Sequence, residues 1–138
     1  MSDTKPMVDA NILVYAHNRD VPQYPQAKAL LTELIENNGF YLNTLVLQEF
    51  FSVITDGRKI EKPLESESAL SIINNICQSG NIELLSVKES DFFHWLEPFI
   101  SSIRRYQIFD AFIAYTMYQN NVKVLYTNNT KDFKNFAF

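Results

Sequence analysis

Three acidic residues in this sequence lie beside apolar segments, where a carboxylate needs a partner. Asp9 directly follows an apolar pair, Glu49 lies beside an apolar helical stripe, and Asp110 is enclosed by apolar residues on both sides. Carboxylates that converge raise one another's pKa values unless a cation neutralises them. Oxygen ligands suit Mg²⁺ or Mn²⁺, and ions held in this way support the hydrolysis of phosphodiester bonds. The three acids therefore indicate a metal-dependent hydrolase, provided that the fold brings them together.

Each acid also has an ordinary structural explanation when it is taken alone. Asp9 can cap the helix that follows it, and Glu49 can be a solvated helical side chain. Asp110 can be favoured by the positive end of its own helix. It is the hardest to dismiss, because an acid among apolar residues needs a bound cation or another partner. The site hypothesis rests on the combination of the three.

Short apolar segments alternate with longer helical patterns along the chain, and this order predicts the fold. Strands are expected at 7–8, 40–42 and 82–87 and from Val122, and helices at 12–16, 27–35, 43–56, 64–78, 92–100 and 108–117. Pro25 fits the first turn of the second helix, Gly39 lies just past its end, and Asn43 or Thr44 can cap the third. The alternation predicts one α/β domain over 1–138, with a central, mainly parallel sheet of four to five short strands flanked by helices.

Polar residues follow the expected strands at the edge where parallel sheets carry their sites. Asp9 follows the first strand, Asn43 and Thr44 follow the second, and Thr127, Asn128 and Asn129 follow the last. The functional crevice of an open parallel sheet lies outside the carboxyl ends of its strands. We therefore expect these side chains to share one edge with the acids.

Composition limits the class of protein. The chain has 138 residues and a net charge of −4, which argues against binding nucleic acid through an overall positive field. Cys77 is the only cysteine, so an internal disulfide and a thiolate zinc site are excluded, and we expect a buried structural thiol. The N-terminus lacks a signal-peptide pattern, and no apolar stretch approaches membrane-spanning length, so we expect a cytoplasmic protein.

Four segments, in order along the chain, resemble one family. They are V-D-A-N-I-L-V-Y-A (8–16), L-Q-E-F-F-S-V-I (47–54), F-D-A-F-I-A-Y-T (109–116) and L-Y-T-N-N-T-K-D-F (125–133). Together they are similar to PIN-domain ribonucleases, and most of all to the VapC toxins of toxin–antitoxin pairs. The resemblance implies a PIN-like α/β/α sandwich and a Mg²⁺- or Mn²⁺-dependent endoribonuclease.

The same resemblance assigns roles to particular residues. Asp9, Glu49 and Asp110 match the catalytic, metal-binding acids, while Asn11 and Thr127 match residues that steady the acids by hydrogen bonds. The variable fourth acid of the family falls on Asn129, whose amide oxygen can ligate a cation but adds no negative charge. Tight binding of a second metal is therefore in doubt. Asp132 either compensates from nearby or serves as a turn or capping acid.

Contacts to RNA are expected from basic residues near these segments. The candidates for contacts to RNA phosphates are Arg58, Lys59, Arg104 and Arg105, and further basic residues are Lys62, Lys123, Lys131 and Lys134. Each of them, taken alone, can also be an ordinary solvated residue. The aromatic residues at 92, 93, 95 and 99 have helical spacing, which favours a core or a dimer interface over a platform for bases. His17 and His94 have no partner at metal-ligand spacing.

The resemblance further implies a small antitoxin that blocks the site, a homodimer of the toxin and a possible higher toxin–antitoxin assembly. One alternative is a catalytically silent PIN domain that acts as a binding module for RNA or protein, which Asn129 keeps open. A phosphatase of the haloacid dehalogenase type is set aside, because it needs a second aspartate where this chain has Asn11. The RNA target and the cleavage sequence do not follow from the sequence.

Overall fold

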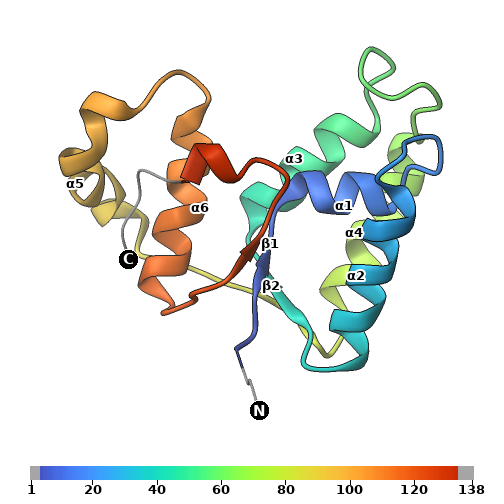
Figure 1. Ribbon diagram of the computed structural model, residues 1–138, viewed down its shortest axis with the longest axis horizontal. Coiled ribbons are helices and arrows are strands. Elements are labelled where there is room, and N and C mark those ends of the chain that lie inside the picture. Colours follow the sequence, from blue (N-terminus) through green and yellow to red (C-terminus); the bar gives the residue numbers. More distant parts are fainter. Residues whose placement is uncertain (1–3, 134–138) are drawn as a thin grey trace.

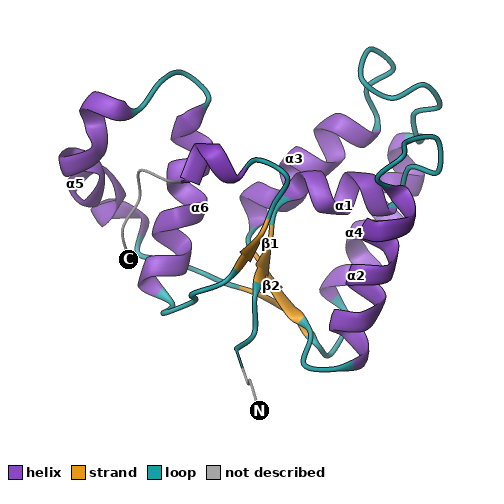
Figure 2. Ribbon diagram, viewed as in Figure 1, coloured by secondary structure: helices purple, strands orange, loops and turns teal. Residues whose placement is uncertain are grey.

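The centre of the protein is a parallel sheet of short strands (Figure 2). The computed structural model describes residues 4–133, apart from the side chain of Asp132. Within that part the strands are β1 (Met7–Val8), β2 (Phe40–Leu42), β3 (Ile82–Leu84) and β4 (Leu125–Tyr126). Their order is β3-β2-β1-β4, and every neighbouring pair is parallel. The predicted α/β class and central parallel sheet are confirmed.

The order of the strands reverses direction beside β1. The chain adds β2 and β3 on one side of β1 and then returns to place β4 on the other side. In open parallel sheets such a reversal leaves a crevice outside the carboxyl ends of the two strands that flank it. In this protein those strands are β1 and β4, so the residues that follow Val8 and Tyr126 lie at the natural position for a site.

Helices cover both faces of the sheet. They are α1 (Ala10–Ala16), α2 (Tyr24–Glu36), α3 (Thr44–Ile54), α4 (Ser66–Cys77), α5 (Phe92–Leu96) and α6 (Gln107–Gln119). Short 3₁₀ turns are η1 (Glu89–Asp91), η2 (Glu97–Ser102) and η3 (Thr130–Phe133). Figure 1 shows α5 and α6 on one side of the strands and α1, α2 and α4 on the other. No helix in the described part has the length and apolar character needed to cross a bilayer.

Two apolar clusters hold the layers together. The larger joins the strands to α1–α4 and takes Ile113 and Met117 from α6, whereas the smaller lies between α5 and α6 around Phe92 and Tyr115. Of the two cap residues proposed from the sequence, Asn43 caps α3, since its Oδ1 accepts from the backbone of Val46 at 2.9 Å. The Asn43 amide also donates to Thr116 on α6, so one buried residue both starts a helix and ties two layers together.

Some local predictions were wrong, and two of the differences have a clear physical reason. The helix expected at 92–100 is α-helical only to Leu96 and continues as a 3₁₀ turn, because Pro98 has no N–H to continue the α-helical ladder. The strand expected from Val122 begins at Leu125, since the Val122 N–H closes the end of α6 by donating to Met117. Cys77 is exposed at the last turn of α4 rather than buried. The prediction of a core or a dimer interface for the aromatic residues is confirmed for Phe92, which is buried, whereas Phe93 is exposed and the interface stays a prediction.

Candidate active site

Asp9 is buried at the carboxyl end of β1, where it has two tasks. As the N-cap of α1 it accepts a 2.7 Å hydrogen bond from the Ala10 N–H through Oδ1. Its second oxygen, Oδ2, accepts a 2.8 Å hydrogen bond from the hydroxyl of Thr127, just beyond β4. The capping explanation and the site explanation are thus compatible, because the two carboxylate oxygens serve different partners.

Thr127 organises the polar residues at this edge of the sheet. Its Oγ1 accepts from the side-chain amide of Asn11 at 3.4 Å and from the backbone N–H of Asn129 at 3.0 Å. Two donors on the oxygen leave its single proton to be donated to Asp9. The structure therefore places Asn11 and Thr127 beside the acid that the sequence analysis assigned to them.

Glu49 lies half-buried on α3 with an unusual environment for a carboxylate. Its Oε1 is enclosed by protein and has no hydrogen-bond partner among the residues that the structure describes. Burial, and secondarily the negative charge of Asp9, raise the pKa of Glu49 to about 7. The coupling means that Asp9 and Glu49 lie within electrostatic reach of each other. Glu49 is therefore not the solvated helical acid of the ordinary explanation.

Asp110 lies in the first turn of α6 and is half-buried. It shares a helical face with Ile113 and Met117, three and seven residues later, which pack into the main core. Its side chain is thereby turned towards the sheet. In the described part of the chain, however, no three His, Cys, Asp or Glu side chains form a group that could hold a metal ion. The structure brings Asp9 and Glu49 within electrostatic reach of each other, and the role of Asp110 as a third acid stays a prediction.

The residues after Thr127 have different outcomes. Asn129 is exposed, and its backbone N–H bonds to Thr127, so it lies at the rim of the site. The side chain of Asp132 and all of Lys134 lie outside what the structure describes. Their predicted roles remain predictions.

Asn128 was expected at this edge from the sequence but was given no role, and in the structure it closes the network. Its backbone N–H donates to Asn11 at 3.2 Å, and its side-chain amide donates to the Tyr15 hydroxyl at 3.2 Å. The available signal was helical spacing, since Tyr15 follows Asn11 by four residues and shares its face of α1. Asn128 thus fixes the loop after β4 against α1.

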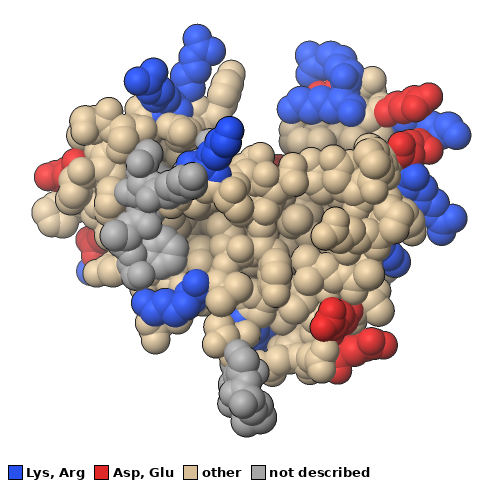
Figure 3. All heavy atoms as spheres, viewed as in Figure 1, with Lys and Arg blue, Asp and Glu red and all other residues tan. Residues whose placement is uncertain are grey.

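Basic side chains stand on both sides of a notch in the surface. Figure 3 shows Lys and Arg side chains on the two raised lobes that border the notch. The segment between α3 and α4 carries Arg58 and Lys59, and the segment between η2 and α6 carries Arg104 and Arg105. The charge of Arg58 is largely neutralised by Asp56, because its guanidinium donates two 3.1 Å hydrogen bonds to that carboxylate. Lys59, Arg104 and Arg105 are exposed.

The donor set fits a divalent cation. The enclosed Oε1 of Glu49 has no hydrogen-bond donor among the described residues, which is unfavourable for an ionised carboxylate. The negative charges of Asp9 and Glu49 also repel each other, and a cation between them would remove that repulsion. The ligands on offer are carboxylate and amide oxygens, which suit Mg²⁺ or Mn²⁺ rather than a thiolate-bound metal. Asp9 and Glu49 are the pair that this fit rests on.

The sequence is similar to known proteins over most of its length. The sequence matches the PIN domain over residues 7–138. It is also similar to Ribonuclease VapC24 from two strains of Mycobacterium tuberculosis, CDC 1551 / Oshkosh and ATCC 25618 / H37Rv. In each case 29% of the 131 aligned residues are identical, and the alignment covers 95% of this chain and 90% of the relative.

Proposed function

The chain belongs to the PIN-domain family, and on that premise we propose that it is a metal-dependent endoribonuclease. The observation that carries the proposal is the Asp9–Glu49 pair. One Glu49 oxygen is enclosed without a partner, and the charge of Asp9 helps to raise the pKa of Glu49. A carboxylate pair of this kind is stabilised when a cation binds between its members.

Asp9 and Glu49 would hold the cation, with Asp110 as a third ligand and Asn129 as a neutral one. A divalent cation bound there supplies positive charge that stabilises the phosphate oxygens during hydrolysis of the phosphodiester bond. Thr127 keeps Asp9 in one orientation, so that its carboxylate does not need to reorganise when substrate binds. The neutral Asn129 adds no charge, which favours one tightly held ion over two.

The basic residues on the two lobes would hold the RNA. Lys59 belongs to the segment between α3 and α4, and Arg104 and Arg105 belong to the segment between η2 and α6, which lie on opposite sides of the molecule in Figure 1. Phosphates of a strand that lies between the two segments would then meet a cation on each side. Contacts to phosphate position a strand without reading its bases. This arrangement explains how a protein with a net charge of −4 can attract a polyanion locally.

The test is cleavage of RNA in Mg²⁺ or Mn²⁺ by the wild type and by Asp9→Asn, Glu49→Gln and Asp110→Asn. We expect a large loss of activity in each variant and in EDTA, whereas Asp20→Asn, an exposed acid outside the site, should cleave like the wild type. Cleavage that survives EDTA and the Asp9 and Asp110 substitutions would rule out the metal-dependent nuclease. Binding of RNA without cleavage by the wild type would favour the alternative, a catalytically silent PIN domain that acts as a binding module.

We also infer a role in a toxin–antitoxin pair in the cytoplasm, based on the similarity to proteins named VapC24. The expected partners are an RNA substrate, a small cognate antitoxin and a second copy of the chain, with a higher assembly when the antitoxin binds. Expression of this chain alone should arrest growth, and co-expression of the neighbouring reading frame should restore it. Light scattering on the purified protein measures whether it is a dimer.

A further inference from the structure

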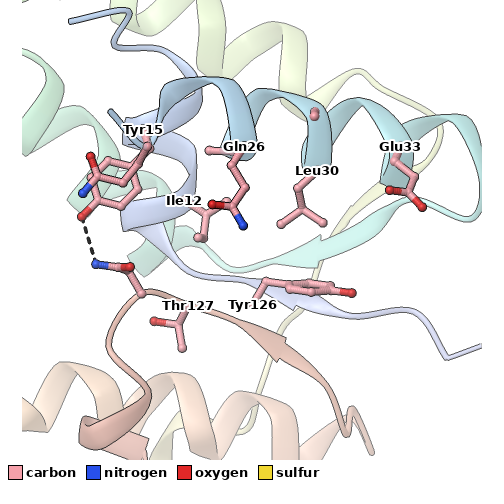
Figure 4. Close-up of a pocket in the computed structure, with 11 residues that line it drawn as sticks. Ile12, Tyr15, Gln26, Leu30, Glu33, Tyr126 and Thr127 are labelled. Atoms are coloured by element: carbon pink, nitrogen blue, oxygen red, sulfur yellow. Dashed lines mark hydrogen bonds between the residues drawn. The ribbon is translucent and has the colours of Figure 1, made fainter. Parts of the chain in front are cut away.

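A cavity of about 490 Å³ opens beside the candidate active site and is not used by the proposed hydrolysis. Its walls come from α1, α2 and the end of β4, and Figure 4 shows Ile12, Gln26, Leu30 and Tyr126 arranged around it. Thr127 belongs to the wall and also donates to Asp9, so the cavity begins one side chain away from a catalytic carboxylate. A group bound there would lie close to the Thr127–Asp9 hydrogen bond.

The lining of this cavity suits a flat, neutral ring with polar edges. Tyr126, a residue that is 37% exposed, offers an aromatic ring, and Ile12 and Leu30 offer apolar contact. Aromatic faces stack with nucleobases in proteins that bind single strands. Among the described residues no lysine or arginine lines the cavity, so these residues offer a phosphate no counter-charge in it. The volume falls within the range of small-molecule pockets.

The polar groups of α2 in the cavity are available for a ligand. Gln26, Leu30 and Glu33 follow helical spacing, so they project from one face of α2 towards Tyr126 (Figure 4). Within the described residues, the side chains of Gln26 and Glu33 make no hydrogen bond or ion pair. A side-chain amide can both donate to and accept from a base edge, whereas a carboxylate only accepts.

From these lining residues we propose that the cavity is a subsite for one nucleobase that carries an exocyclic amino group. The base would stack on Tyr126 against Leu30, its amino group would donate to the Glu33 carboxylate, and Gln26 would bond to another atom of its edge. Carboxylates accept from amino groups on bases, and a uracil offers a carbonyl in the same place. The inference rests on the proposed ribonuclease function and extends it, because it gives the enzyme a base preference next to the cut.

The cavity is tested separately from cleavage by titrating the free nucleosides cytidine and uridine into the protein in EDTA, with chemical shifts as the readout. The two nucleosides have similar size and differ at one amino or carbonyl position. We expect cytidine to shift the resonances of Leu30 and Tyr126 and to bind about ten-fold tighter than uridine. Glu33→Gln should reduce that ratio towards one, and Gln26→Leu should weaken cytidine binding. Glu36→Gln, an exposed acid on the same helix outside the cavity, should change neither.

The second measurement is sequencing of the ends produced when the enzyme cuts a random RNA pool. The wild type should favour an amino-bearing base at one position beside the cut, and Glu33→Gln should relax that position alone. Equal binding of cytidine and uridine, or a base preference unchanged in Glu33→Gln and Gln26→Leu, would overturn the subsite. If cleavage survives EDTA and the Asp9→Asn and Asp110→Asn substitutions, the metal-dependent nuclease proposal fails instead, while the nucleoside titration continues to report on the cavity.

Discussion

The hydroxyl of Thr127 donates a 2.8 Å hydrogen bond to the carboxylate of Asp9, across 118 positions of the chain. The two residues end β4 and β1, the strands between which the order of the sheet reverses. The candidate site is therefore formed by the closure of the sheet itself, since the orientation of Asp9 depends on β4 pairing beside β1. Asn11 and the backbone of Asn129 in turn fix the direction of the Thr127 proton.

Thr127→Val tests this relationship, because valine keeps the shape of threonine and removes the hydroxyl. The substitution leaves Asp9 Oδ2 without the Thr127 donor. It also leaves the side-chain amide of Asn11 and the backbone N–H of Asn129 without the acceptor that Thr127 provides. We expect the free energy of unfolding in urea to fall by about 1–2 kcal/mol and the cleavage rate to fall with it. Thr127→Ser retains the hydroxyl and should keep most of the wild-type free energy of unfolding and most of the wild-type cleavage rate. Equal behaviour of the valine and serine variants would contradict an orienting role for the hydroxyl.

Glu49 should give the metal-free protein a characteristic dependence of stability on pH. Burial and the charge of Asp9 raise the pKa of Glu49 from its ordinary 4.5 to about 7, so between these values the folded protein holds a proton that the unfolded chain has released. Stability from this group is present at low pH and is lost as pH rises through that window. Urea unfolding in EDTA should show this loss in the wild type and not in Glu49→Gln.

Mn²⁺ supplies the complementary measurement on Glu49. A cation needs the ionised carboxylate, so the stabilisation that Mn²⁺ gives should grow as pH rises from below to above about 7. In Glu49→Gln this growth should be much smaller. Stabilisation by Mn²⁺ that is independent of pH in the wild type would show that Glu49 does not bind the cation.

The polar strand ends were predictable from the sequence because their chemistry is local. A short apolar strand followed by Asp9, or by Thr127, is visible without knowing which strands are neighbours. The order of the strands was not predictable in the same way, because the residues of β4 do not indicate whether this strand pairs with β1 or with β3. The Asp9–Thr127 contact in this fold followed instead from the resemblance to PIN domains.

The cluster of acids shows a second limit of the sequence. Helical spacing puts Asp110 on the same face of α6 as Ile113, but spacing gives no distance between side chains on different helices. Whether Asp110 joins Asp9 and Glu49 depends on how α6 packs against the sheet, and the described residues do not form a three-acid group. Tertiary packing therefore decides a feature that the pattern of residues only suggests.

Arg104 and Arg58 should differ in their effect on RNA binding, although both are exposed arginines beside the notch. Arg58 is already bonded to Asp56, so it must break those bonds to reach a phosphate. Arg104→Gln should weaken RNA binding and reduce the dependence of log K on log salt by about 0.7 for each phosphate that the variant no longer neutralises. Arg58→Gln should have a smaller effect on both RNA binding and its salt dependence. A larger effect from Arg58 would mean that Asp56 orients it for RNA rather than neutralises it.

Gly39 should be the glycine whose substitution is costly. Its φ of 78° lies in the left-handed region, and a Cβ there would come within 1.6 Å of the backbone oxygen of Asn81. We expect Gly39→Ala to destabilise the fold by about 1–3 kcal/mol from backbone strain, with the clash adding to that loss. Gly80→Ala is the matched control, because a Cβ at Gly80 has no neighbour within 4 Å. Comparable unfolding midpoints for the two variants would contradict this account of the turn into β2.

Asn129→Asp tests whether the loop after β4 contributes a corner of the metal site. Asn129 is exposed two residues after Thr127, to which its backbone is bonded, so the backbone contact survives the substitution. A carboxylate at this position adds a negative charge to an oxygen-ligand site, and charge count is a principal determinant of cation affinity. We expect the affinity for Mn²⁺, measured by calorimetry, to rise about ten-fold.

Asn128→Asp separates direct ligation from the general effect of an added charge. It introduces the same charge one residue earlier, where the side chain instead faces the Tyr15 hydroxyl on α1. If Asn129 faces the cation, only the Asn129 variant should gain substantial affinity for Mn²⁺. An equal gain in both variants would indicate a long-range field, because neither side chain would then need to touch the ion. No gain in Asn129→Asp would make the stretch after β4 a structural turn, whose contribution to the site ends at Thr127.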